Sequence, residues 1–160
     1  SSRNYFRSSK AHNITTSLSK SQSELIKSFR YGKKSKLINF KKIDQNVNIR
    51  YLEVKNIFKY NEISRDISCL DKGIIFSDST YLSNSISYIH FSPNVSIKKF
   101  SDRKFQLIKN DKILYLEILS TINNNKIIKT PYAEKFYKKM FKNTLIINFN
   151  NNLKYKFTYE

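Results

Sequence analysis

Residue types that build many common ligand sites are scarce in this sequence. Two glycines in 160 residues are too few for the glycine-rich loops that hold nucleotide phosphates in α/β enzymes. The single cysteine, Cys69, cannot form an intrachain disulfide, and the two histidines, His12 and His90, cannot make a three-histidine metal site. We therefore exclude the common nucleotide-binding motifs and cysteine-rich zinc sites, and expect Cys69 to be a small buried side chain in a strand.

Long apolar runs are also missing. No stretch approaches the roughly 18 to 20 apolar residues of a transmembrane helix, so we expect no membrane span. The chain begins with Ser1, and its first residues resemble neither a signal peptide nor a mitochondrial presequence. We expect this N-terminus to be a cut inside a longer protein.

Acidic residues are few against a large basic excess. The chain has 30 Lys+Arg and 12 Asp+Glu, which gives a formal net charge of +18. Such a charge attracts nucleic acid, an anionic membrane surface or an acidic polysaccharide. The lysines are spread through every segment, and no aromatic-rich strand of the RNA-binding type is present, so we do not expect nucleic acid as a partner.

Short apolar runs rich in Ile, Val, Phe and Tyr are typical of strands. The clear runs are 47–57, 74–76, 86–91, 104–108, 113–119, 145–149 and 153–159. Turn-forming clusters fall at 71–73, 109–111, 123–125 and 150–152. The pattern predicts one all-β domain, a two-layer antiparallel β-sandwich with little helix. Residues 21–29 have room for two helical turns, and residues 132–141 fit a helix or a loop bounded by Pro131.

Several motifs follow one another in the N-terminal third. They are RNYFRSSKAHN at 3–13, QSE at 22–24 and FRYG at 29–32. An aromatic-Arg-Ser stretch, Ala-His-Asn, Gln-Ser-Glu and Phe-Arg-x-Gly occur at this spacing in the C-terminal β-sandwich of the heparinase II/III-like family of polysaccharide lyases. The chain resembles that family, and the resemblance continues more loosely through Arg65, Asp78, HFSPNV at 90–95 and TPYAEKFYKK at 130–139.

The resemblance implies a two-part enzyme. In the family, an N-terminal α/α toroid forms most of the sugar cleft and a β-sandwich of the super-sandwich type supplies one wall. Residues 1–160 would be that sandwich, as a fragment lacking its toroid partner. The implied reaction is β-elimination on a uronic-acid polysaccharide, and the implied location is periplasmic or secreted.

The same resemblance assigns roles to individual residues. His12 of the Ala-His-Asn motif is the expected catalytic residue, because an imidazole can donate to a uronate carboxylate or relay a proton near neutral pH. Arg7 and Arg30 are expected to bind substrate carboxylates through their planar guanidinium groups, and Tyr60 is the remaining substrate-binding candidate. Asn13 is expected to make a supporting hydrogen bond. The catalytic base is not assigned.

No cofactor is expected. Some family members bind zinc through histidines of this sandwich, but this chain has Asn61 and Glu62 where many members have a histidine. We therefore expect no metal. Two other functions stay open, namely a noncatalytic basic β-domain that binds polyanions, either acidic glycan or nucleic acid, and a purely structural module.

Overall fold

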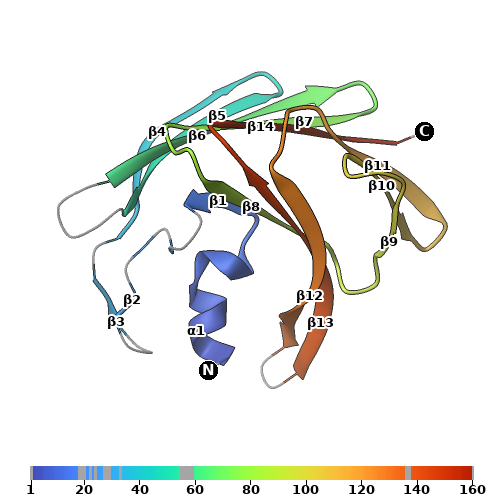
Figure 1. Cartoon of the computed structure of the whole chain (residues 1–160), viewed down its shortest axis with the longest axis horizontal. Coiled ribbons are helices and arrows are strands. Elements are labelled where there is room, and N and C mark those ends of the chain that lie inside the picture. Colours follow the sequence, from blue (N-terminus) through green and yellow to red (C-terminus); the bar gives the residue numbers. More distant parts are fainter. Residues whose placement is uncertain are drawn as a thin grey trace.

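Two antiparallel β-sheets form most of the chain (Figure 1). The computed structural model describes residues 2–17, 21, 23, 25–26, 30–32, 34–54, 60–135 and 138–159. Strand accounts for 67% of the chain and helix for 6%. The predicted all-β sandwich with little helix is confirmed.

The larger sheet has eight strands and the smaller has four. In spatial order, the larger sheet contains β4 (Lys36–Ile43), β5 (Asn46–Val54), β6 (Tyr60–Leu70), β7 (Gly73–Thr80), β14 (Asn152–Thr158), β11 (Lys112–Ile118), β10 (Lys104–Lys109) and β9 (Ser96–Lys99). The smaller sheet contains β1 (Ile14–Ser17), β8 (Ser85–His90), β13 (Lys138–Phe149) and β12 (Asn124–Lys135). The remaining elements are the α-helix α1 (Ser2–Arg7), the 3-10 turn η1 (Ser9–Ala11) and the short pair β2 (Leu25–Ile26) and β3 (Arg30–Tyr31).

The main core lies between the two sheets. Alternating residues of β14 face inward, so Leu153 is fully buried while its neighbour Lys154 is exposed. From the smaller sheet, Ile147 and Phe149 of β13 enter the same cluster, and Phe105 of β10 joins them. Burial of these side chains from both sheets is the main stabilisation of the sandwich.

One segment differs from its predicted structure. Of residues 132–141, expected as helix or loop, positions 132–135 and 138–141 lie in the paired strands β12 and β13. Tyr132 pairs with Met140, and a register shift occurs between Ala133 and Lys135. The prediction is wrong because strand pairing along the whole hairpin outweighs the local helix-like spacing. For residues 21–29, the structure describes β2 in the middle, and positions 22, 24 and 27–29 lie outside the described residues.

The prediction for Cys69 is also wrong. Its side chain is exposed. Cys69 lies one residue from the end of β6, beside the turn at 71–72. A four-stranded sheet cannot cover the full width of an eight-stranded one, and Leu70 at the same end of β6 is also 43% exposed.

The strand β4, which the sequence patterns did not predict, forms one edge of the larger sheet. Every residue of β4 is exposed, including Leu37 at 66% and Phe40 at 58%. Its apolar residues are interspersed with Lys36, Lys41 and Lys42. Its stability therefore comes mainly from pairing with β5.

The N-terminal segment packs on the outer face of the smaller sheet (Figure 1). On that face, Ile86 and Tyr88 of β8 and Ile146 of β13 form a second apolar cluster, against which Ile14 packs. The strand β1 is an edge strand that begins directly after Asn13. The His-Asn motif therefore lies at a strand start, at one edge of the smaller sheet. Within the described residues, no helix has the length and apolar character needed to cross a membrane.

Candidate functional site

His12 lies between η1 and β1, on the exposed side of the smaller sheet. Its backbone N–H donates to the carbonyl of Ser9 at 3.2 Å, which closes the short turn. Its Nε2 lies 3.2 Å from the carbonyl oxygen of Phe6. Because a carbonyl oxygen only accepts, this contact assigns the proton to Nε2 and leaves the Nδ1 lone pair available in the neutral ring.

His12 and Arg7 line one open polar pocket of about 380 Å³. Lys34 lines the same pocket from the loop before β4. The described lining residues bring an imidazole, a guanidinium and an ammonium together and include no carboxylate. This arrangement suits a carboxylate or sulfate group, which a guanidinium binds with two parallel hydrogen bonds. We name it the His12 pocket.

Lys34 is a candidate that the sequence patterns did not identify. It stands among many lysines and lies two residues beyond the Phe-Arg-x-Gly motif that ends at Gly32. Only the folded chain returns this loop to the N-terminal turn that carries His12. Proximity to the motif was the one available indication.

Serine hydroxyls join the walls of the His12 pocket. The backbone N–H of Ser9 donates to the Ser21 hydroxyl at 3.0 Å, and Ser9 is 5% exposed. The backbone N–H of Ser35 donates to the Ser23 hydroxyl at 2.9 Å. These bonds tie Ser21 to η1 and Ser23 to the loop before β4.

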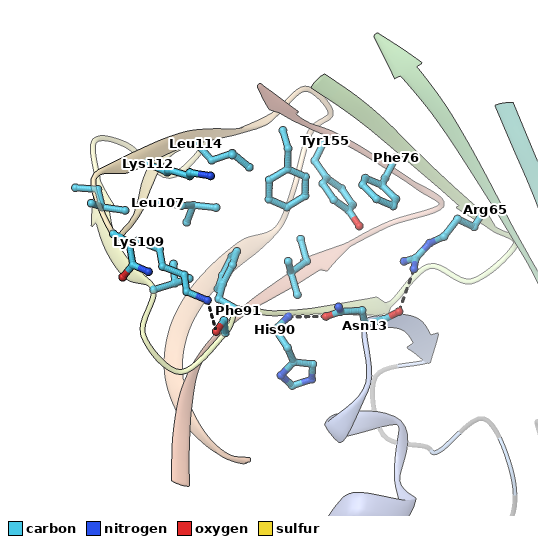
Figure 2. A pocket seen from close by; sticks show the side chains of 16 residues that line it. Asn13, Arg65, Phe76, His90, Phe91, Leu107, Lys109, Lys112, Leu114 and Tyr155 are labelled. Carbon is cyan, nitrogen blue, oxygen red and sulfur yellow. Dashed lines mark hydrogen bonds between the residues drawn. The ribbon is translucent and has the colours of Figure 1, made fainter. Parts of the chain in front are cut away.

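A buried ion pair between Arg65 and Asp78 fixes the backbone next to His12, through the hydrogen bond from Arg65 to Asn13 that Figure 2 shows. The guanidinium of Arg65 donates from Nε and Nη2 to the two carboxylate oxygens of Asp78, at 2.6 and 2.7 Å. Its Nη1 donates to the carbonyl oxygen of Asn13 at 3.0 Å, and Thr15 Oγ1 also donates to Asp78. Asp78 is 2% exposed, so its charge is compensated by these donors rather than by water.

Asn13 has the supporting role expected from the sequence. Its side-chain oxygen accepts from the backbone N–H of His90 at 2.6 Å. Together with the bond from Arg65, this contact holds Asn13 between β8 and the larger sheet. The position of His12 relative to both sheets is set by these bonds to its neighbour.

His90 lies on the same outer face of the smaller sheet as Tyr88, whose ring is stacked on it at 6.4 Å. Its Nδ1 is 2.7 Å from Thr144 Oγ1, which is 2.6 Å from Thr130 Oγ1. Burial, then repulsion by Lys142, lowers the pKa of His90 to about 4. The ring is therefore neutral at physiological pH and packs against Tyr88 on this face.

The other predicted site residues are described less fully. Arg30 lies in β3 and Tyr60 begins β6, but their side chains lie outside the described part of the structure. Gln22, Glu24 and Phe29 of the motifs lie outside it altogether. The substrate-binding roles of Arg30 and Tyr60 stay predictions. Among the described residues, no group of three or more His, Cys, Asp or Glu side chains is placed to hold a metal ion.

Known structures share this fold. The heparan sulfate lyase HepC from Pedobacter heparinus matches 98% of this chain with a TM-score of 0.71 and 11% identity. The chain has the fold of one domain of this lyase. The heparinase III BT4657 gene product matches 99% of the chain with a TM-score of 0.70 and 12% identity. No protein-family model and no curated protein matches the sequence.

The matches cover nearly all of this chain and a small part of each lyase. The chain spans 25% of the length of HepC and 25% of the BT4657 heparinase III. The motif-based resemblance to heparinase II/III-like lyases is thus confirmed as a shared domain fold. At this level of identity the comparison concerns the fold, and activity, substrate and partner domains are matters for proposal.

Proposed function

We propose that residues 1–160 are the C-terminal β-sandwich of a polysaccharide lyase that cleaves a uronic-acid polysaccharide by β-elimination. One observation carries the proposal: Arg7, His12 and Lys34 line a single open pocket whose described lining contains no carboxylate. An anionic sugar ring entering this pocket meets two cationic donors, Arg7 and Lys34, and an imidazole that donates from Nδ1 when protonated. The basic excess of the whole chain adds attraction for a polyanion.

The chemistry requires neutralisation of the uronate carboxylate. The proton on the adjacent carbon is too weakly acidic for a side-chain base until the negative charge that develops on removal is stabilised. Arg7 and Lys34 supply that stabilisation by binding the carboxylate. When a base takes the proton, the C–H electron pair forms the new carbon–carbon double bond, and the C–O pair leaves with the departing sugar oxygen.

His12 acts on protons at this site. Because Nε2–H is bonded to the Phe6 carbonyl, Nδ1 is the ring nitrogen that remains to exchange a proton with the substrate. Protonated, Nδ1 donates to the uronate carboxylate or to the leaving oxygen, and neutral, it accepts a proton relayed from the substrate. The remaining wall of the cleft, with the base, is assigned by the proposal to a toroid partner domain.

The test is His12→Ala in the intact protein. We expect turnover to fall by about 10² or more, the usual contribution of a positioned acid–base or charge-stabilising group. His90→Ala is the matched histidine control and should lower stability while the folded fraction retains turnover. Release of unsaturated products is measured by ultraviolet absorbance, with circular dichroism to confirm folding. Near-parental turnover of folded His12→Ala would contradict the catalytic assignment.

The noncatalytic alternative gives a different outcome. A domain that only binds polyanions would lose affinity for acidic glycans in Arg7→Ala and His12→Ala. The intact parent protein would then release no unsaturated product from any uronate polysaccharide. That combination would replace the lyase proposal with a binding function for the same pocket.

A further inference from the structure

A larger cavity, of about 640 Å³, lies between the two sheets (Figure 2) and shares no lining residue with the His12 pocket. Phe76, Tyr155 and Phe157 of the larger sheet form one side of it, and Ile89 and Phe91 the other. Its volume lies within the usual range of small-molecule pockets, about 300 to 1,000 Å³. The proposed lyase chemistry does not use this space.

The cavity walls are mainly aromatic and aliphatic. The rings of Phe76 and Tyr155 are stacked at 5.1 Å, and Phe157 meets both edge-on. Leu107 and Leu114 continue this apolar surface toward solvent, where Leu114 is 37% exposed. An apolar ligand binds most favourably to a surface of this kind, because the water molecules that it displaces make few hydrogen bonds there.

Two lysines stand together at one side of this cavity. Lys109 and Lys112 are direct cross-strand partners at the end of the β10–β11 hairpin, and both line the cavity. The turn between them consists of Asn110 and Asp111, both with positive φ, and Asp111 is not part of the lining. Like charges placed opposite one another on a hairpin repel. A bound anion would relieve that repulsion.

No acidic side chain offsets these charges within the cavity. The described lining contains no Asp or Glu, and within the described residues neither lysine takes part in an ion pair. Lys109 Nζ donates to the hydroxyl of Ser92 at 3.2 Å. The third cation of the lining, Arg65, is already engaged by Asp78. The free positive charge is therefore concentrated at Lys109 and Lys112.

We propose that this cavity binds a long-chain fatty acid. The hydrocarbon tail lies between the aromatic rings of the larger sheet and Phe91, and the carboxylate binds Lys109 and Lys112. Acidic sugars lack the apolar surface that these walls require, and a neutral lipid would leave the paired lysines without a partner. The combination of one apolar tail and one anionic head matches both halves of the site.

The first measurement compares two ligands that differ only in the head group. Purified 160-residue chain is titrated with the fluorescent fatty acid cis-parinaric acid, which is then displaced by palmitate or by hexadecanol. We expect palmitate to displace it at about tenfold lower concentration. The double variant Lys109→Ala/Lys112→Ala should lose this preference, whereas Lys126→Ala, an exposed lysine on β12, should keep it. Equal displacement by both ligands in the parent chain would overturn the role of the lysines.

The second measurement uses two neighbouring positions on β11. Leu114 lines the cavity, whereas Ile113 points to the opposite face of the sheet, and the two are 37% and 39% exposed. Leu114→Glu should abolish probe binding, and Ile113→Glu should leave it unchanged, with both variants folded by circular dichroism. Equal binding by the two variants would overturn the proposal. Sedimentation with and without palmitate tests the other occupant. A dimer that is dissociated by Leu114→Glu but not by palmitate would assign the cavity to a second copy of the chain.

Discussion

Arg65 donates a hydrogen bond of 3.0 Å to the carbonyl oxygen of Asn13 while holding Asp78 with its two other donor positions. One side chain thus links the interior of the larger sheet to the residue next to His12. The guanidinium is 13% exposed and the carboxylate side chain 0%, so both charges depend on one another for compensation. The location of the His12 pocket depends on this link.

Asp78→Asn should strongly destabilise the domain. The amide keeps the size of the side chain but removes the charge that compensates Arg65, and breaking a buried pair costs about 3–5 kcal/mol. Urea unfolding of parent and variant measures the difference. Glu62→Gln breaks the more exposed pair with Arg50 and should cost less than about 1 kcal/mol. Similar losses in the two variants would contradict the importance assigned to the buried pair.

His90 should make stability fall on acidification. Its pKa is about 4 in the folded chain and 6.5 in the reference state. Between these values the unfolded chain binds a proton at His90 and the folded chain does not, so stability is present above pH 6.5 and is lost as the pH falls toward 4. Each pKa unit is worth about 1.4 kcal/mol, and partial exposure of the ring reduces the total to about 1–2 kcal/mol.

The measurement for His90 is urea unfolding at several values between pH 7.5 and 4. His90→Gln should remove about 1–2 kcal/mol of the pH dependence, apart from any uniform loss of stability caused by breaking the contact with Thr144. An unchanged slope in His90→Gln would show that other groups cause the acid sensitivity.

Lys34→Ala should weaken substrate binding in the intact protein, provided that the proposed function is correct. Loss of one exposed cation from the His12 pocket is expected to raise KM for an acidic polysaccharide by about three- to tenfold. It should also reduce the dependence of KM on salt, because fewer charges are then screened. Lys129→Ala, an exposed lysine on β12, serves as the charge-matched control. The same KM in both variants would show that Lys34 does not bind the substrate.

Residues 1–160 alone should have little lyase activity. The proposal assigns the base and most of the sugar cleft to a toroid domain, and groups that act as a unit lose far more than an additive share when separated. The purified chain is incubated with heparan sulfate and other uronate polysaccharides, and absorbance of unsaturated products is followed. Rapid product formation by this chain would mean that the base lies within these 160 residues.

Much of the fold was predictable because the strands are strongly patterned. Leu153 and Tyr155 alternate with lysines, and the sheet buries the side that the alternation predicts. Turn residues at 71–73 and 109–111 lie where hairpins reverse, and those at 150–152 lie where the chain passes from β13 in the smaller sheet to β14 in the larger one. The edge strand β4 and the helix α1 were missed because neither is marked by an apolar face that the core must bury.

The site was predictable only where a motif marked it. The Ala-His-Asn motif indicated His12 and the supporting role of Asn13, and the preceding aromatic-Arg-Ser stretch indicated Arg7. Lys34 lines the same pocket because the folded chain brings its loop back to the N-terminal turn, and no local sequence pattern predicts this contact. The pairing of Arg65 with Asp78 likewise depends on the register of β6 and β7.

The open edge of β4 gives the basic charge of the chain a second physical role. In the described part of the chain, no strand pairs with the outer side of β4, so its backbone groups are available to a strand of another molecule. The exposed side chains of Leu37 and Phe40 would favour pairing with such a strand. Lys36, Lys41 and Lys42 oppose it when the other molecule is a copy of this chain, because their ammonium groups repel one another along the same edge. The resistance of the protein to aggregation therefore depends on ionic strength. Concentrated salt screens the repulsion between the lysines and so favours association of molecules through their β4 edges.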